Sequence, residues 1–265
     1  MRVFVNGVGL VGPGLTGWAA SRPVLADLAP YRPAPTIVPS DELLPAAERR
    51  RTGTVVKLAI AVGQEALAQA GIDAASTPTV FTSSSSDGEN LHAICETLAL
   101  PEPEISPTRF HNSVHNAAAG YWGIATRSLA PSTSLCCFDG SFAAGLLEAS
   151  IQASTDGATV GLIAYDLPYP APLNASRHVY ASFGVALVLS PMRSEPTVGL
   201  IEFAPEAMHD EATGMSDAGL EALRAGVPAA RSLPLLAALA RGASATLRID
   251  YLQDLQLKVS VAPCS

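Results

Sequence analysis

The stretch S-L-C-C-F-D-G-S-F-A-A-G, residues 134–145, decides how the rest of the chain is interpreted. The run 134–138 is short and mostly apolar, which is typical of a buried strand. The small apolar residues that follow predict a helix over 142–153. Between them, Asp139-Gly140-Ser141 is a turn signal. A strand that turns sharply into a helix exposes the side chain at the turn beside the helix N-terminus. The stretch therefore predicts an elbow with Asp139 at its tip.

Strands and helices alternate on both sides of this elbow. The expected strands are 2–6, 77–82, 159–165 and 182–189, and the expected helices are 58–67 (stopping at Gly71), 89–98 and 114–126. Residues 7–14 are expected to form a glycine-rich turn, and the proline-rich residues 20–45 an irregular excursion. This alternation predicts an α/β sandwich around a largely buried sheet.

The pattern changes after about residue 203. Helices are expected at 217–224 and 233–241, followed by two alternating strands, 245–250 and 256–261, whose short connection predicts a hairpin. We expect a single domain over residues 1–265, in which residues 204–265 are a C-terminal extension.

Composition excludes several classes of partner. Hydrophobic residues make up 48% of the chain and charged residues 15%, so the chain can build a sizeable core. The formal charge of −8 provides no basic footprint for nucleic acid or anionic lipid. No apolar run is long enough to span a membrane, and the glycine-rich N-terminus makes a poor signal peptide. We expect a cytoplasmic protein.

Neither a metal nor a nucleotide cofactor is expected. The cysteines at 95, 136, 137 and 264 lack the spacing of a zinc site, and small buried residues in a reducing cytosol are the simplest interpretation. Adjacent Cys136 and Cys137 would point to opposite faces of a strand. Residues 7–12 match G-x-G-x-x-G, but Pro13 and Gly14 stand where the phosphate-binding helix should begin. Ser83 to Ser86 precede no Gly-Lys-Ser/Thr motif, so they predict a loop at a strand end and not a phosphate cradle.

Two interpretations of Asp139 follow from the residues alone. Its carboxylate could cap the helix that begins near Phe142, as aspartate commonly does. Alternatively, Asp139 or Ser141 could be a nucleophile served by His111 or His115, with Asp166 as a third group, in an independent hydrolase or acyltransferase. The motif G-x-S-x-G is absent, because the sequence is F-D-G-S-F, and capping is the simpler interpretation.

The segment from Ile105 to Ala149 resembles the part of a β-ketoacyl synthase that runs into the nucleophile turn. The matching features are Ser106-Pro107, Asn116 before a small-residue helix with Gly120, Pro131-Ser132, and the elbow. The opening R-V-F-V-N-G-V-G-L-V-G-P, residues 77–88 and the run G-V-A-L-V-L-S at 184–190 fit other positions of the same family. The resemblance covers about residues 1–203. It implies the N-terminal half of a thiolase-like fold, with a mixed five-stranded sheet and helices on both faces.

The same resemblance implies that the condensing machinery is missing. Counted from Pro131-Ser132, the position of the family's catalytic cysteine is Asp139, while Cys137 and Cys136 lie earlier. The family also uses two histidines from its second half, whereas only His209 follows residue 203 here. The pattern is similar to short chain length factors of aryl polyene, fatty acid and polyketide pathways.

The resemblance to such proteins implies a heterodimer with an active β-ketoacyl synthase and contact with acyl carrier protein. It also implies that this chain has no catalytic residue of its own. Whether the isolated chain forms a homodimer is left open. The residues implied at the partner interface and acyl tunnel are Thr108, Arg109, Phe110, His111, Ser134, Cys136 and Phe138.

Overall fold

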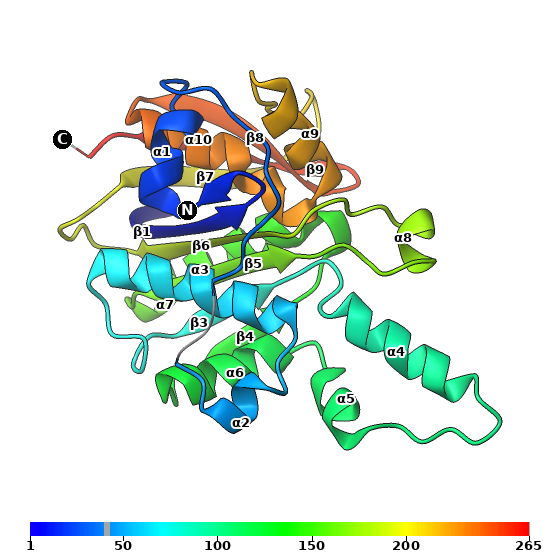
Figure 1. Cartoon of the computed structure of the whole chain (residues 1–265). Coiled ribbons are helices and arrows are strands. Elements are labelled where there is room, and N and C mark those ends of the chain that lie inside the picture. Colours follow the sequence, from blue (N-terminus) through cyan, green and yellow to red (C-terminus); the bar gives the residue numbers. More distant parts are fainter. Residues whose placement is uncertain (40–42, 265) are drawn as a thin grey trace.

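The computed structural model of the chain describes residues 1–39 and 43–264. In these residues one mixed sheet of nine strands runs through the molecule, in the order β4-β3-β5-β6-β1-β7-β9-β8, with β2 paired to β1 (Figure 1). The strands are β1 (Arg2–Gly12), β2 (Leu15–Thr16), β3 (Thr79–Thr82), β4 (Ser132–Leu135), β5 (Val160–Asp166), β6 (Phe183–Ser190), β7 (Gly199–Ala207), β8 (Ala245–Leu252) and β9 (Leu255–Ala262). The helices are α1 (Trp18–Leu25), α2 (Ala46–Arg49), α3 (Thr54–Ala70), α4 (Gly88–Leu98), α5 (Pro107–Asn112), α6 (Ala117–Thr126), α7 (Ser141–Asp156), α8 (Leu173–Ser176), α9 (Ala218–Gly226) and α10 (Leu233–Arg241), with 3₁₀ turns η1 (Phe138–Gly140) and η2 (Pro228–Ser232).

The predicted α/β sandwich is confirmed. Strands β4, β3 and β5 are parallel, and β6 runs antiparallel between β5 and β1, so these five strands form the mixed sheet expected for the first half of the chain. Helices α3 and α6 cover one face through a core that contains Phe81, Trp122 and Ile163. Helices α7 and α10 cover the other face around residues such as Leu146 and Leu162.

The glycine-rich segment is part of a strand, so the turn predicted over residues 7–14 is wrong for most of its length. Strand β1 continues to Gly12, and the turn is confined to the residues just before β2. A β-carbon on Gly7 would collide with the carbonyl oxygen of Ala66 in α3, and one on Gly9 with the carbonyl oxygen of Val62. The glycines therefore allow α3 to pack with its backbone directly on β1.

Helix α3 also supplies hydrogen-bond acceptors to β1. A carboxylate oxygen of Glu65 accepts the Leu10 N–H at 2.8 Å, and the amide oxygen of Gln69 accepts the Val8 N–H at 2.7 Å. Burial raises the pKa of Glu65, which is offset in part by the backbone hydrogen bonds. Helix and strand are thus joined by polar contacts as well as by close packing.

The C-terminal residues extend the sheet and are not an appendage beside it. Strand β7 pairs with β1, β9 pairs with β7, and β8 and β9 form the predicted hairpin. Strand β7 was not expected, because Pro205 breaks its pattern and its outer positions are polar. Helix α1 likewise lies inside the segment expected to be irregular, part of which (residues 40–42) falls outside the described residues.

In the part of the chain that the structure describes, no helix is both long and apolar enough to cross a membrane.

Candidate functional site

The elbow between β4 and α7 has an extra turn that the sequence did not predict. Strand β4 ends at Leu135 and not at Phe138, so Cys136 and Cys137 lie beyond it, followed by η1. Cys95 and Cys136 are exposed and Cys137 and Cys264 are half-buried, so the interpretation of the cysteines as small buried residues is wrong. The Sγ of Cys136 lies 3.2 Å from the carbonyl oxygen of Ser84. Burial raises the pKa of the Cys137 thiol, which disfavours the reactive thiolate.

The strained residue of the elbow is Phe138. Its φ of 49° is in the left-handed region, which non-glycine residues seldom adopt and which costs of order 1–3 kcal/mol. Its ring is 60% exposed, and the guanidinium of Arg177 stacks 3.6 Å from the ring centre. An aromatic ring, and not a nucleophile, therefore occupies the strained position.

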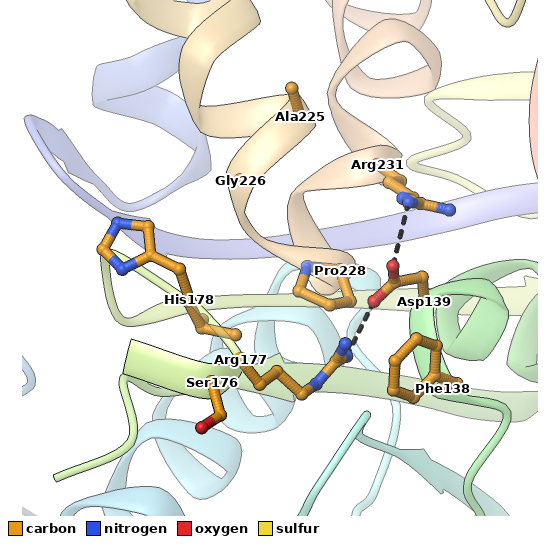
Figure 2. Close-up of a pocket in the computed structure, with 10 residues that line it drawn as sticks. Phe138, Asp139, Ser176, Arg177, His178, Ala225, Gly226, Pro228 and Arg231 are labelled. Carbon is orange, nitrogen blue, oxygen red and sulfur yellow. Dashed lines mark hydrogen bonds and ion pairs between the residues drawn. The ribbon is translucent and has the colours of Figure 1, made fainter. Parts of the chain in front are cut away.

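Asp139 does not cap the helix, so the capping interpretation is wrong. The N-cap of α7 is Gly140, without a side-chain hydrogen bond, because the extra 3₁₀ turn moves Asp139 away from that position. Its carboxylate lies between two arginines, with Oδ1 2.7 Å from Nη2 of Arg177 and Oδ2 3.4 Å from Nη2 of Arg231 (Figure 2). Arg231 also faces Asp250 of β8 at 3.7 Å. Both oxygens of Asp139 are thus engaged in ion pairs, an unfavourable state for a nucleophile or a general base.

These ion pairs border a pocket of about 510 Å³. Figure 2 shows Asp139 between the two arginines, with Phe138 and Pro228 beside them. The other lining residues come from 176–179 and 225–226. The pocket therefore brings together the elbow, the segment before β6 and the C-terminal part of the chain.

The triad considered for a hydrolase does not assemble. Ser141 is buried, and its Oγ donates to the carbonyl of Phe138 at 2.7 Å and accepts the Cys137 N–H at 3.0 Å. His111 is exposed and meets Tyr121 edge to face, while Nε2 of His115 lies 2.6 Å from the carbonyl oxygen of Leu135. Among the described residues, no hydrogen bond or ion pair joins either histidine to Asp139 or Ser141.

Asp166 is a buried hub at the end of β5 that the sequence did not predict. Its Oδ1 accepts the backbone N–H and the hydroxyl of Ser84 at 2.8 and 2.6 Å, and its Oδ2 accepts the Ala229 N–H of η2 at 2.8 Å. Burial raises its pKa to about 6 even though these hydrogen bonds lower it. The serine loop at 83–86 is therefore tied to a carboxylate inside the protein, and not presented as a phosphate cradle.

The residues implied at the interface and tunnel fall into two places. Phe138 lines the elbow pocket beside Cys136 and the end of β4, which carries Ser134. Thr108, Arg109, Phe110 and His111 form most of α5, which with α4 projects to one side of the sheet (Figure 1).

A second recess, of about 520 Å³, lies where α5 meets the start of α3. Its lining includes Thr108 and four cations, which are Arg50, Arg51, Lys57 and Arg109, together with the acidic residues Asp87 and Glu89. In a chain of net charge −8, this recess concentrates positive charge at one point of the surface.

Comparison with known proteins agrees with this geometry. Residues 20–249 match the family model described as "Beta-ketoacyl synthase, N-terminal domain". The chain belongs to this family. No curated protein matches it.

Several solved structures share the β-ketoacyl synthase fold of this chain over its whole length. One is a ketosynthase in complex with its chain length factor from Xenorhabdus doucetiae, with 21% identity, a TM-score of 0.74, and coverage of 98% of this chain and 99% of that chain. Another is the ishigamide ketosynthase/chain length factor, with 15% identity, a TM-score of 0.73, and coverage of 100% and 99%. A third is a type II polyketide synthase acyl-carrier protein in complex with its ketosynthase bound to the hexaketide, with 12% identity, a TM-score of 0.76, and 99% coverage of both chains. At these identities the likeness establishes the fold.

Proposed function

We propose that the protein is a chain length factor, a non-catalytic ketosynthase-like subunit that pairs with an active β-ketoacyl synthase and shapes its acyl tunnel. The observation that carries this proposal is the elbow. Phe138 occupies its strained position, and Asp139 beside it is held by Arg177 and Arg231. With Phe138 and Asp139 at these positions, the turn itself carries no cysteine that would take an acyl chain as a thioester, which supports a non-catalytic role. The full-length likeness to complexes that contain a chain length factor supports the same role.

Co-expression tests the pairing. We expect a tagged copy of this chain to retain an active β-ketoacyl synthase from the same pathway in a one-to-one complex. The complex, and not either chain alone, should elongate acyl groups on a carrier protein. If the two chains separate on size exclusion while the synthase alone gives the same products, the proposal is wrong.

We propose that pairing occurs along β4. This strand ends the sheet, so its outer side carries unpaired backbone groups in the described structure, as an edge strand does. Exposed apolar side chains gather on the neighbouring segments, namely Phe110 (67%), Val114 (50%) and Phe138 (60%). Apolar surface beside an open edge is a typical feature of a protein–protein interface.

A proline can test this edge without breaking the sheet. In the parallel ladder, Thr79 N–H donates to the carbonyl of Pro131 and Ser83 N–H to that of Leu135, so by alternation the N–H of Ser134 faces outward. We expect Ser134→Pro to abolish pairing while the isolated protein stays folded. Thr246→Pro on β8, the opposite edge, is the matched control and should pair normally.

We further propose that the basic recess contacts the acyl carrier protein, because its four cations suit an acidic surface or a phosphate group. Arg50→Glu and Lys57→Glu, each made alone, should weaken carrier binding to the complex about tenfold or more at low salt. Lys258→Glu, on β9, is the control for a change of the same charge elsewhere. If the two recess variants and the Lys258→Glu control bind the carrier protein equally well, the recess is not the contact surface.

We place the pair in the cytoplasm. The cysteines are free thiols, and Cys95 and Cys136 are exposed, which suits a reducing compartment.

A further inference from the structure

The C-terminal part of the chain reaches the elbow at two points directly and at a third through Asp166 and Ser84. We call the residues that make these contacts the C-terminal brace: Ala229 and Arg231 of η2, and Asp250 and Tyr251 of β8. The first contact is the ion pair of Arg231 with Asp139, which continues from Arg231 to Asp250. The ion pair thus connects the elbow to β8 through η2.

The second contact is between backbones. A β-carbon on Gly140 would collide with the carbonyl oxygen of Tyr251, so β8 lies directly against the last residue of η1. The third contact is the hydrogen bond from Ala229 N–H to Asp166, which also holds Ser84, whose carbonyl accepts the thiol of Cys136.

The elbow needs such support because Phe138 is strained. A non-glycine residue keeps a left-handed φ only when its surroundings hold it there. Cys137 and Ser141 bond within the elbow, Arg177 stacks on the ring and pairs with Asp139, and Thr82 of β3 donates its hydroxyl to the carbonyl of Ser141 at 2.8 Å. The brace adds a connection from the elbow to β8, and Arg231 is the member of the brace that pairs with both an elbow side chain and a side chain of β8.

We propose that Arg231 is a positioning residue: through Asp139 it holds the elbow in the conformation that presents Phe138 and Cys136 to the partner subunit. The part about presentation rests on the proposed function, whereas the restraint on the elbow does not. The proposal assigns a role to the C-terminal extension, which is to fix the elbow from within the same chain.

Hydrogen exchange on the isolated protein tests the restraint. In Arg231→Gln, the backbone amides of residues 137–141 should exchange about two to five times faster, as expected from the loss of a partly buried ion pair. Arg231→Lys, which keeps the charge, should restore most of the protection. Arg248→Gln is the matched control, because Arg248 of β8 also pairs with two acidic residues, Glu206 of β7 and Asp210, away from the elbow.

Unchanged exchange at the elbow in Arg231→Gln, or equal acceleration in Arg248→Gln, would overturn the proposal. If Arg231→Gln does not fold, Asp250→Asn provides the same test, because it removes the anchor of Arg231 without altering the elbow. That variant should accelerate exchange at 137–141 more than Arg248→Gln does, and equal rates would contradict the inference.

The paired complex tests the presentation. With the synthase bound, Arg231→Gln should change the distribution of product lengths, and Arg248→Gln should not. Suppose that exchange at residues 137–141 is faster in isolated Arg231→Gln but the product lengths of its complex are unchanged. Arg231 then restrains the elbow, but the claim that it presents Phe138 and Cys136 to the partner subunit is refuted. If the wild-type chain does not pair at all, the proposed function fails, and the exchange result still decides the restraint.

Discussion

Substitution of Asp139 separates the ion-pair role from helix capping. Asp139→Ala removes the carboxylate that lies 2.7 Å from Arg177 and 3.4 Å from Arg231. The side chains are 38%, 23% and 21% exposed, respectively, so solvent screens these pairs in part and each contributes about 0.5–1 kcal/mol. Repulsion between the two guanidinium groups left behind adds a few tenths of a kcal/mol. We therefore expect a loss of about 1–2 kcal/mol in the free energy of unfolding.

The discriminating variant is Asp139→Asn. Asparagine caps helices as well as aspartate does, so a capping role predicts no loss. An ion-pair role predicts that Asn loses nearly as much as Ala, and that the loss shrinks in high salt because the charges are screened. Urea unfolding at low and at 1 M salt, with Arg177→Gln to close a double-mutant cycle, measures both effects.

A wild-type stability for Asp139→Asn, or additive effects of the Asp139 and Arg177 substitutions, would refute this reasoning. In the paired complex, total product formation should persist in a folded Asp139→Ala variant, because the proposed role gives the carboxylate no part in the chemistry. A collapse of activity in the intact complex would instead assign it one.

Further predictions concern stability and activity elsewhere. Burial raises the pKa of Asp166 from 3.8 to about 6, so its contribution to stability is present below pH 3.8 and is lost as the pH rises through 6; Asp166→Asn should flatten the measured dependence of unfolding free energy on pH across this window. Gly9→Ala should destabilise the protein by about 1–3 kcal/mol in urea unfolding because α3 must move, whereas Gly120→Ala, which points into open space on a helix, should not. Phe110→Ala and Phe110→Trp should shift product length in opposite directions in the co-expressed pair, and unchanged products from an intact complex would remove α5 from the tunnel. Partner-free protein should form no ketoacyl product by mass spectrometry, and acylation of Cys137 would contradict this.

Local signals predicted the sandwich well. Apolar spacing and the stop at Gly71 located α3. Strand β7 was not predicted because one of its faces is exposed to solvent and it contains a proline. From sequence alone, such a segment cannot be distinguished from a loop. The glycines of β1 were assigned to a turn, because glycine is favoured both in turns and where a helix backbone packs closely on a strand.

The elbow shows where prediction from sequence ends. Its existence followed from the strand–turn–helix pattern, but the ion pairs of Asp139 did not, because Arg177 lies 38 residues away and Arg231 farther still. Nothing local indicates that these side chains converge. Without those partners, a cap was the natural interpretation of an aspartate before a helix.

The central place of β1 in the sheet has a consequence for how the chain folds. Apart from the short β2, the neighbours of residues 2–12 in the sheet are β6 and β7, at 183–190 and 199–207, which are synthesised much later than β1. The first strand must therefore wait for some 180 residues of synthesis, and its pairing closes one of the longest loops in the chain. Contacts this distant in sequence slow folding and leave a hydrophobic strand unpaired meanwhile. At translation rates of about 5–20 residues per second, that interval is of order 10–40 s.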